Sequence, residues 1–282
     1  MNKKIKLFRS MLAMLLVLLL IMLAGCTENN KKPQPADESE HNVKSVEELL
    51  EAIKPGASIT IAQGEYNLTD FLAGYSDYAD YNAWNENHEY VELREVYDGM
   101  EIVIKNVEGL QISGEEGDEE VEIVTEPRYS TVLNFENCTD IKLTRLIMGH
   151  TNAGDCSGDV LGFVNTREIN LSFLELYGCG VYGISCMEAC GNLYAADVRI
   201  HSCTYGPISI WDSVGKIEFD SCIFSESNGG GYYDGGSESE LIFNNCTFGQ
   251  EESNMWLFRE DATFDNCQFD EPTIYPDYSG VY

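Results

Sequence analysis

The sequence predicts an all-β solenoid, a coil of short parallel strands in which each turn lies on the one before it. Two sets of apolar phrases, with no helical pattern between them, support this prediction. The first set has apolar residues at i, i+2, i+5 and i+7 and starts at Ile141, Ile169, Leu193, Ile217, Leu241 and Ala262, which are 28, 24, 24, 24 and 21 residues apart. The second set starts at Leu161, Ile184 and Ile208, with spacings of 23 and 24 residues. Each turn therefore contains at least three short strands, and each strand pairs in parallel with its counterpart one turn later.

The geometry of one phrase excludes other repeat folds. Alternate residues of a strand share a face, so the pairs i/i+2 and i+5/i+7 both point inward, and the extra residue between them turns a corner. A leucine-rich repeat would show Leu-x-x-Leu-x-Leu, and a propeller blade needs about 40 residues. A coil of this period without a helix fits a right-handed parallel β-helix of roughly seven rungs, which we place at residues 44–271.

The N-terminus predicts export. Residues 1–25 have a basic start and an uncharged apolar run from Met11 to Leu23, which is typical of a signal peptide and short for a membrane-spanning helix. The run ends in Leu-Ala-Gly-Cys26, which resembles the lipobox of bacterial lipoproteins. The resemblance implies a cleaved signal peptide, a lipid on Cys26 and an extracytoplasmic protein anchored to the bacterial membrane. We expect membrane contact through that lipid only.

Residues 26–43 are polar and without apolar periodicity, so we expect a flexible tether. A capping box at Ser45 and Glu48 predicts a short helix that ends at Pro55-Gly56 and plugs the N-terminal end of the solenoid. Residues 71–99 break the period and are rich in Tyr, and we expect a long loop or insertion that packs on the first rungs. Residues 272–282 form a tail that we expect to cover the last rung.

The charge balance excludes one class of partner. The chain of 282 residues has 17 Lys+Arg and 48 Asp+Glu, a net charge of −31. Nucleic acid and anionic membranes need Lys and Arg at their phosphates, so we expect no nucleic-acid partner. Cations, and neutral or basic ligands, are favoured.

From Ser45 to about Phe269 the chain resembles the right-handed parallel β-helix repeat proteins of the pectate-lyase-like class. The helix before Pro55-Gly56, the Ile59-x-Ile61 strand and the Gly64-x-Tyr66 turn carry this resemblance. A closer likeness is to bacterial surface proteins with the segments Gly149-His150-Thr151, Cys156-Ser157-Gly158, Leu176-Tyr177-Gly178-Cys179-Gly180 and Cys203-Thr204-Tyr205-Gly206. That subgroup has no established activity, so the resemblance implies a fold and leaves the function open.

Nine cysteines follow Cys26: Cys138, Cys156, Cys179, Cys186, Cys190, Cys203, Cys222, Cys246 and Cys267. Their repeat positions favour buried thiols that fill the core, although export would permit disulfides. Their number is odd, and no zinc-ligand spacing is present, so neither full pairing nor a metal site is expected.

Candidate functional residues lie on outward columns of the rungs. One column contains Tyr177 and His201, and nearby turns supply His150, Asp155, Asp159, Tyr182 and Tyr205. A second column contains Asn165, Glu188 and Asp212, and a third candidate is Tyr232-Tyr233-Asp234. Stacking and hydrogen bonding along the rungs explains such columns without any activity.

Polysaccharide is the expected ligand, with two functional hypotheses. A lyase needs a base such as His201 or His150, with Tyr177 beside it, and often Ca²⁺, for which Asp155 and Asp159 are candidates. The resemblance to the pectate-lyase-like class implies an arginine base instead, for which Arg199 and Arg167 are the available residues. A hydrolase needs a carboxyl pair such as Glu188 and Asp212, with Tyr182 and Tyr205 holding the sugar.

The non-catalytic hypothesis is a monomeric binding module or spacer at the cell surface. It is supported by the near absence of the catalytic patterns of the resembled class, since Gly149-His150-Thr151 alone approaches one.

Overall fold

The computed structural model describes residues 40–152, 154, 157–178, 180–233, 238–250 and 262–270. The predicted signal peptide, Cys26, most of the tether, Asp155, Cys156, Cys179, Asp234 and the tail at 272–282 lie outside these residues. Among the described helices, none is long and apolar enough to cross a membrane.

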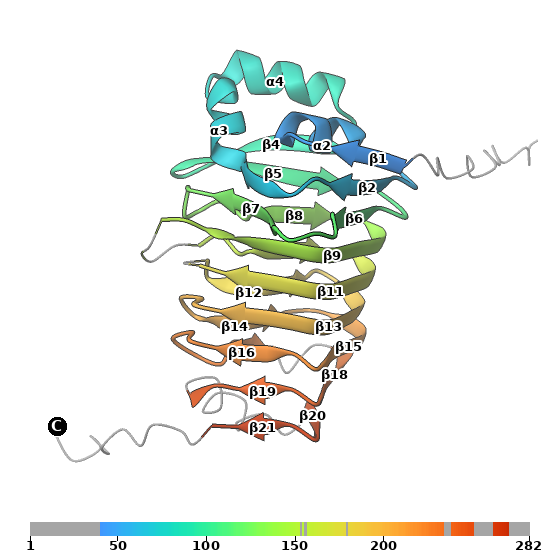
Figure 1. The fold of residues 1–282 in the computed structure, drawn as a ribbon, viewed down its shortest axis with the longest axis vertical. Coiled ribbons are helices and arrows are strands. Elements are labelled where there is room, and N and C mark those ends of the chain that lie inside the picture. Colours follow the sequence, from blue (N-terminus) through green and yellow to red (C-terminus); the bar gives the residue numbers. More distant parts are fainter. Residues whose placement is uncertain are drawn as a thin grey trace, which may run out of the picture. The chain divides into compact units, whose positions relative to one another are not determined.

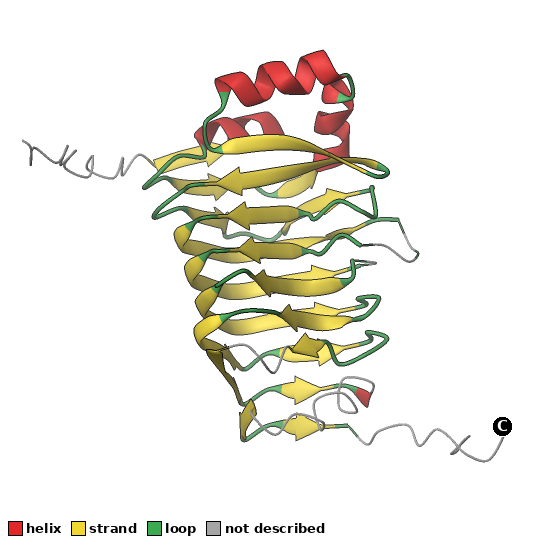
Figure 2. Cartoon of the chain, turned by 180° about the vertical axis from the view of Figure 1, so that it is seen from behind, coloured by secondary structure: helices red, strands yellow, loops and turns green. Residues whose placement is uncertain are grey.

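The described chain is mostly strand, with few short helices (Figures 1 and 2). The helices are α2 (Val46–Ala52), α3 (Leu68–Leu72), the 3-10 helix η1 (Ala73–Tyr75) and α4 (Tyr78–Asn87). The strands of the long sheet are β1 (Glu40–Val43), β2 (Ser58–Ile61), β3 (Gly64–Asn67), β6 (Gln111–Gly114), β7 (Val121–Thr125), β9 (Thr139–His150), β11 (Arg167–Tyr177), β13 (Gly191–His201), β15 (Val214–Asp220), β16 (Ile223–Ser225), β18 (Glu238–Asn244), β19 (Thr247–Phe248), β20 (Ala262–Asp265) and β21 (Gln268–Phe269). The strands of the short sheet are β4 (Val91–Val96), β5 (Gly99–Lys105), β8 (Leu133–Glu136), β10 (Leu161–Val164), β12 (Tyr182–Met187), β14 (Gly206–Ile210) and β17 (Tyr232–Tyr233).

These strands form a β-solenoid of about five turns, so the expected count of roughly seven rungs is not confirmed. A 14-stranded sheet and a 7-stranded sheet wind around one core, and among the described strands every pair is parallel except β4 with β5. Both ladders have the predicted register, because Ile169 pairs with Ile141 and Leu193, and Ile184 pairs with Leu161 and Ile208. The prediction of parallel sheets is confirmed.

A single residue turns each corner within the long phrases. The φ angles are between 53° and 57° at Arg145, Phe173, Asp197, Ser221, Asn245 and Asn266. This left-handed conformation bends β9, β11 and β13 into two arms while both arms keep their apolar residues inward, as the i, i+2, i+5, i+7 pattern predicts. Apart from glycine, Asn is among the residues that tolerate this conformation best. The Asn266 side chain also donates a hydrogen bond of 2.7 Å to the Asn245 side chain in the preceding turn.

The core consists of columns of equivalent side chains. The Phe219, Phe243 and Phe264 rings are stacked with centroids 5.3 and 5.1 Å apart. Six of the seven described cysteines are buried, as predicted, and Cys267 is partly buried. Burial raises the pKa of Cys138 to about 11, so its thiol stays protonated at neutral pH and is unreactive as a nucleophile.

Residues 71–99 are an insertion whose aromatic side chains pack on the core, as expected, but they do not form a loop. This segment forms η1, α4 and β4, and Figure 1 shows α4 at the N-terminal end of the β-helix. Two hydrogen bonds of 2.8 and 2.9 Å join the Asn85 side chain to the backbone of Leu93, and the Trp84 indole donates to Val91 at 3.3 Å. These side chains satisfy backbone groups of the edge strand β4 that a sheet neighbour would otherwise take.

The predicted helix after Ser45 is present as α2, and the Ser45 hydroxyl accepts from the Glu48 N–H at 3.1 Å. Its apolar face joins the same core, while its role as a plug stays a prediction. Four residues of the predicted tether, Glu40–Val43, form β1 and pair in parallel with β2, so the ordered β-structure starts before residue 44.

We predict that truncation of one stacked ring destabilises the whole stack. Phe243→Ala leaves a cavity between rings and is expected to lower the free energy of unfolding by about 3–5 kcal/mol in urea denaturation. Phe173→Ala is the matched control, since that ring is exposed, and it is expected to change stability by less than about 1 kcal/mol. Equal losses in the two variants would contradict the assigned core.

Candidate functional site

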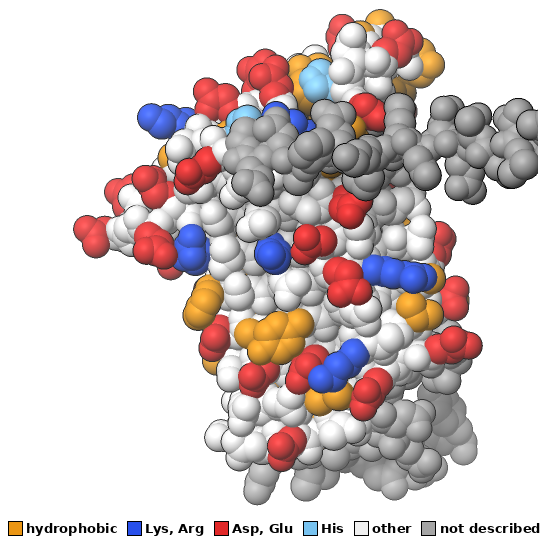
Figure 3. Space-filling view, turned by 90° about the vertical axis from the view of Figure 1, so that its right-hand side faces the viewer, with side chains coloured by type: hydrophobic (Ala, Val, Ile, Leu, Met, Phe, Trp, Pro, Cys, Tyr) orange, Lys and Arg blue, Asp and Glu red, His pale blue; other side chains and the backbone are white. Residues whose placement is uncertain are grey.

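A groove of about 590 Å³ follows the bend of the long sheet, beneath the acidic segment between β6 and β7. Its floor contains residues from the bends and second arms of β9, β11 and β13, together with Ile223 of β16. Figure 3 views the bend side of the β-helix, where carboxylates crowd a projection and basic and apolar side chains lie below it. The groove crosses several rungs, so an elongated ligand suits it better than a compact one.

Phe173 is the unusual residue of the groove. It occupies a corner where the neighbouring turns have Arg145, Asp197 and Ser221, and 60% of its surface is exposed. A bulky residue in the left-handed conformation is uncommon and costs conformational free energy. An exposed aromatic ring gains no burial energy that would offset this cost. Packing in the core therefore does not explain Phe173.

Charged groups surround this ring. The groove is lined by the carboxylates Glu115, Glu116, Glu119, Glu120, Glu175 and Asp197 and by the guanidinium groups of Arg145 and Arg199. Arg145 pairs with Glu116 at 3.5 Å, and Arg199 pairs with Glu175 at 3.7 Å and with Glu226 at 3.6 Å. Both cations are thus compensated by carboxylates, and the groove as a whole is acidic.

The predicted pair Tyr177 and His201 comes together at one end of this surface. Their rings are stacked with centroids 5.9 Å apart. A Cβ at Gly149, in the preceding turn, would lie 2.7 Å from the Tyr177 ring. The ring therefore lies across that turn only because residue 149 is glycine. The Tyr177 hydroxyl donates to Glu122 at 2.6 Å. Burial, and then this bond, raises the pKa of Tyr177, so Tyr177 holds its proton at neutral pH.

Glu175 links this pair to the groove. It lines the groove, and its Oε1 lies 2.9 Å from Nε2 of His201, while Nδ1 of His201 lies 3.0 Å from the Ser202 hydroxyl. A carboxylate on one nitrogen fixes the orientation of an imidazole and is the usual partner of a histidine base. The side chain of His201 is only 14% exposed, so a substrate would meet it at the edge of the ring.

His150 follows Gly149, the pairing partner of Tyr177, but its side chain is buried. It is 4% exposed, and its Nε2 lies 2.7 Å from the Ser130 carbonyl, which makes Nε2 the protonated nitrogen. Burial lowers the pKa of His150, and its Nδ1 has no partner among the described residues. An imidazole with so little exposed surface is a poor candidate for a base that acts on a polymer.

The remaining predicted binding residues form two separate groups. The Tyr182 and Tyr205 rings lie 6.4 Å apart, beside the short sheet, and Tyr205 is exposed. Glu188 and Asp212 occupy successive corners after β12 and β14, with φ of 54° and 48°. Asn165 has the same conformation one turn earlier, so left-handed backbone accounts for this column without a ligand. Tyr177 and His201 lie on the long sheet, so the predicted residues do not form one constellation.

Asp159 belongs to a polar cluster on the short sheet. Its carboxylate accepts from the Tyr182 N–H at 3.1 Å and from Ser185, and its backbone N–H donates to Thr131. Thr131 also donates to Glu101, which is 7% exposed. Burial raises the pKa of Glu101, and burial raises the pKa of Asp159 to about 7.

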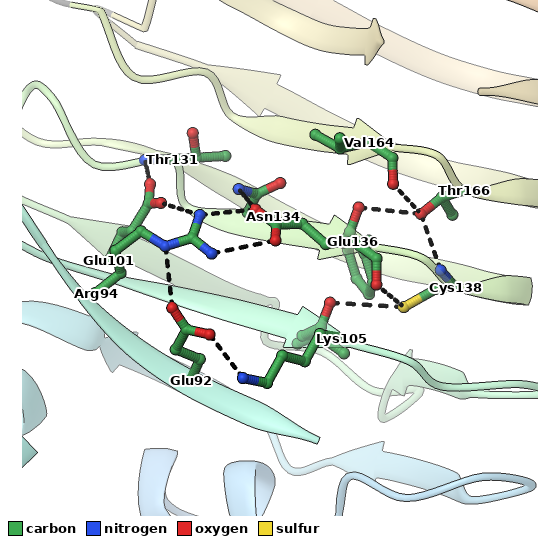
Figure 4. A network of polar contacts seen from close by, with 12 residues as sticks. Glu92, Arg94, Glu101, Lys105, Thr131, Asn134, Glu136, Cys138, Val164 and Thr166 are labelled. Atoms are coloured by element: carbon green, nitrogen blue, oxygen red, sulfur yellow. Dashed lines mark hydrogen bonds and ion pairs between the residues drawn. The ribbon is translucent and has the colours of Figure 1, made fainter. Parts of the chain in front are cut away.

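Figure 4 shows how Arg94 holds this part of the sheet together. Arg94 makes two hydrogen bonds to Glu136, at 2.7 and 3.1 Å, and a third to Glu92 at 3.1 Å. Glu92 also accepts from Lys105 at 2.6 Å. The network joins β4, β5 and β8, and a bidentate Arg–carboxylate pair of this kind is a structural clamp for the antiparallel edge strand.

Calcium remains a prediction without support from this geometry. Ca²⁺ takes six to eight oxygen ligands, whereas the partners of the Asp159 carboxylate are hydrogen-bond donors. Within the described residues, no group of three or more His, Cys, Asp or Glu side chains is placed to hold a metal ion. Asp155, the other predicted ligand, lies outside those residues.

Sequence reasoning did not identify the groove, Phe173 or the carboxyl cluster around Glu101. Phe173 carried a usable signal, because the same position of the next four turns holds Asp197, Ser221, Asn245 and Asn266. Glu101 and Arg94 carried none. They form an ion pair of 3.6 Å only because β4 pairs antiparallel with β5, inside a segment that lacks the repeat.

Comparison with known proteins supports the fold. A family model described as "Right handed beta helix region" matches residues 161–280. One solved structure, the alginate lyase from Paenibacillus sp. str. FPU-7, aligns over 83% of this chain and 75% of its own chain, with 11% identity and a TM-score of 0.45. No curated protein matches the chain. The right-handed β-helix prediction is thus confirmed over the matched region, and the distant structural overlap carries no argument about activity.

The raised pKa of Asp159 predicts a stability that falls with pH. A carboxyl group whose pKa is higher in the folded than in the unfolded state stabilises the fold below the unfolded value, near 4, and loses this contribution as the pH rises to about 7. Asp159→Asn removes the titration and keeps the oxygen that accepts from Tyr182. We expect the variant to match the parent at pH 4 and to be about 1–3 kcal/mol more stable at pH 8 in urea denaturation. A difference that does not vary with pH would contradict the assignment.

Proposed function

We propose that this chain is a polysaccharide-binding β-helix whose binding surface is the groove at the bend of the long sheet. The carrying observation is the groove itself, about 590 Å³ in volume, with the exposed Phe173 ring among charged side chains. Sugar rings have an apolar face that stacks on aromatic side chains and hydroxyl groups that bond to carboxylates and guanidinium groups.

The rigidity of the floor supports this function. The floor residues are on strands that pair on both sides, as Glu175 does with Ile147 and Arg199. A surface that is ordered before binding loses little entropy when it takes up a ligand. Successive rungs are spaced by about 4.8 Å, so the same column presents side chains at regular intervals to a polymer of repeated units.

Cleavage of the bound polymer is the second candidate, because Glu175 orients His201 at the edge of the groove and Tyr177 lies against it. In such a reaction the substrate displaces the Ser202 hydroxyl from Nδ1 of His201, which takes a proton from the sugar and returns it to the leaving oxygen, while Glu175 stays on Nε2. A β-elimination lyase acts on uronates, however, and the acidic groove repels them. Binding without turnover is therefore the function that we put first.

We also propose that Cys26 carries the lipid that holds this module on the outer face of a bacterial membrane. The lipobox-like sequence that ends at Cys26 supports the anchor. The polar residues after Cys26 would form a flexible linker between the lipid and the β-helix.

Loss of the Phe173 ring should abolish glycan binding and leave the fold intact. Phe173→Asn places at this corner the residue that occupies it in the later turns, so stability should stay equal or rise by up to about 1 kcal/mol. Retention of purified protein on a panel of immobilised glycans should fall at least about tenfold, which corresponds to roughly 1.4 kcal/mol. Unchanged retention of the variant would exclude the groove.

The same panel, incubated with the parent in solution, tests cleavage. Release of reducing ends or unsaturated products that is lost in His201→Ala would establish an enzyme. Retention without products would establish a binding module.

Substitution of the lipidated residue tests the anchor. Cys26→Ser should move the protein from the membrane fraction to the soluble fraction of a bacterial expression host and should end incorporation of labelled fatty acid. Continued membrane fractionation of Cys26→Ser without label would instead indicate an uncleaved N-terminal anchor.

A further inference from the structure

We propose that the groove selects a polysaccharide with free amino groups, a polymer of hexosamine units, over neutral or uronic acid polymers. This inference rests on the proposed function, since it names the class of glycan that the same groove takes. The argument depends on the local charges, the apolar patch between them and the pairing of the surrounding strands.

Part of the negative charge of the groove is not compensated by the protein. Arg145 and Arg199 are paired with carboxylates, as described above. In the described part of the chain, the exposed carboxylates of Glu119, Glu120 and Asp197 form no ion pair. These carboxylates line one groove, so they repel one another electrostatically. Their repulsion makes binding of a cation between them more favourable. An ammonium group bound between them relieves this repulsion, whereas a uronate increases it.

The apolar patch restricts the cation to one with a flat apolar face. Phe173 is 60% exposed and Ile223 is 45% exposed, and both line the groove together with Ile147. A hydrated metal ion gains nothing from covering these side chains. A hexosamine ring places axial C–H groups on one face and an ammonium group at its rim, so it satisfies the ring and the carboxylates together. Ammonium groups over aromatic faces add a further attraction.

The pairing of the strands argues against a basic peptide. A peptide commonly binds a sheet by adding a strand to a free edge. The second arms that form the floor already pair on both sides, β11 with β9 and with β13. A peptide would therefore lie on the groove through its side chains only, without backbone hydrogen bonds to the sheet.

Isothermal titration of the full-length chain with four oligomers of equal length tests the proposal. The oligomers are glucosamine, N-acetylglucosamine, a uronic acid and lysine. The proteins are the parent, the double variant Glu119→Gln/Glu120→Gln, Phe173→Asn, and Glu95→Gln as the control, which removes one exposed carboxylate from β4, outside the groove.

We expect the glucosamine oligomer to bind at least about tenfold more tightly than its acetylated form, and the uronate not to bind. Exposed ion pairs contribute 0.2–1 kcal/mol each, so the double variant should lose about fivefold in affinity for glucosamine and none for the acetylated oligomer. Added salt should reduce the glucosamine preference. Phe173→Asn should weaken both oligomers, and Glu95→Gln neither.

The failures are distinguishable. Equal binding of the acetylated and free-amino oligomers, with both lost in Phe173→Asn, would overturn the amino-sugar class and keep the glycan function. Binding of no oligosaccharide, or binding that ignores Phe173, would overturn the proposed function itself. Lysine oligomers that bind as tightly as glucosamine and are insensitive to Phe173→Asn would replace the glycan by a basic peptide.

Discussion

Register is the constraint on which this β-helix depends. Each turn must bring the chain back over the equivalent residue of the turn before, because parallel strands make evenly spaced hydrogen bonds only in register. The bend in the long sheet meets this requirement with one residue in left-handed conformation, and that residue recurs at the same place from Arg145 to Asn266. A turn with a longer connection there would displace both arms of the strand.

The same constraint organises the interior and the surface. Inside, it aligns Phe219, Phe243 and Phe264 as a stack and places buried cysteines one above another. Outside, it aligns polar side chains in columns, so Tyr177 meets His201 and Asn245 meets Asn266. A column is therefore weak evidence of function, since the backbone produces it everywhere. Phe173 differs because it interrupts a polar column and exposes an apolar ring, which costs stability in both respects.

The N-terminal end shows how the solenoid deals with an open edge. There β4 runs antiparallel to β5, and side chains of α4 satisfy backbone groups of β4. Arg94 of β4 then joins β8 across β5 by its two hydrogen bonds to Glu136, and Lys105 of β5 joins β4 by its hydrogen bond to Glu92. The carboxylates of this network therefore stabilise the fold. Burial raises the pKa of Glu101 and of Asp159, which lie near the short sheet.

The sequence alone determined the elements that repeat. The apolar phrases from Ile141 onward defined the two ladders, their register, the corner between the arms and the inward direction of the cysteines, because a period of about 24 residues in a stacked coil leaves little freedom. The tertiary structure decided what does not repeat. Residues 71–99 formed a helix and an antiparallel strand because an edge needed partners, and their local pattern contained no sign of that partner. The groove arose where an acidic segment without periodicity lies over the bend. Burial separated the His150 side chain from the pair Tyr177 and His201, because burial depends on neighbours such as Ser130 that are distant in the sequence.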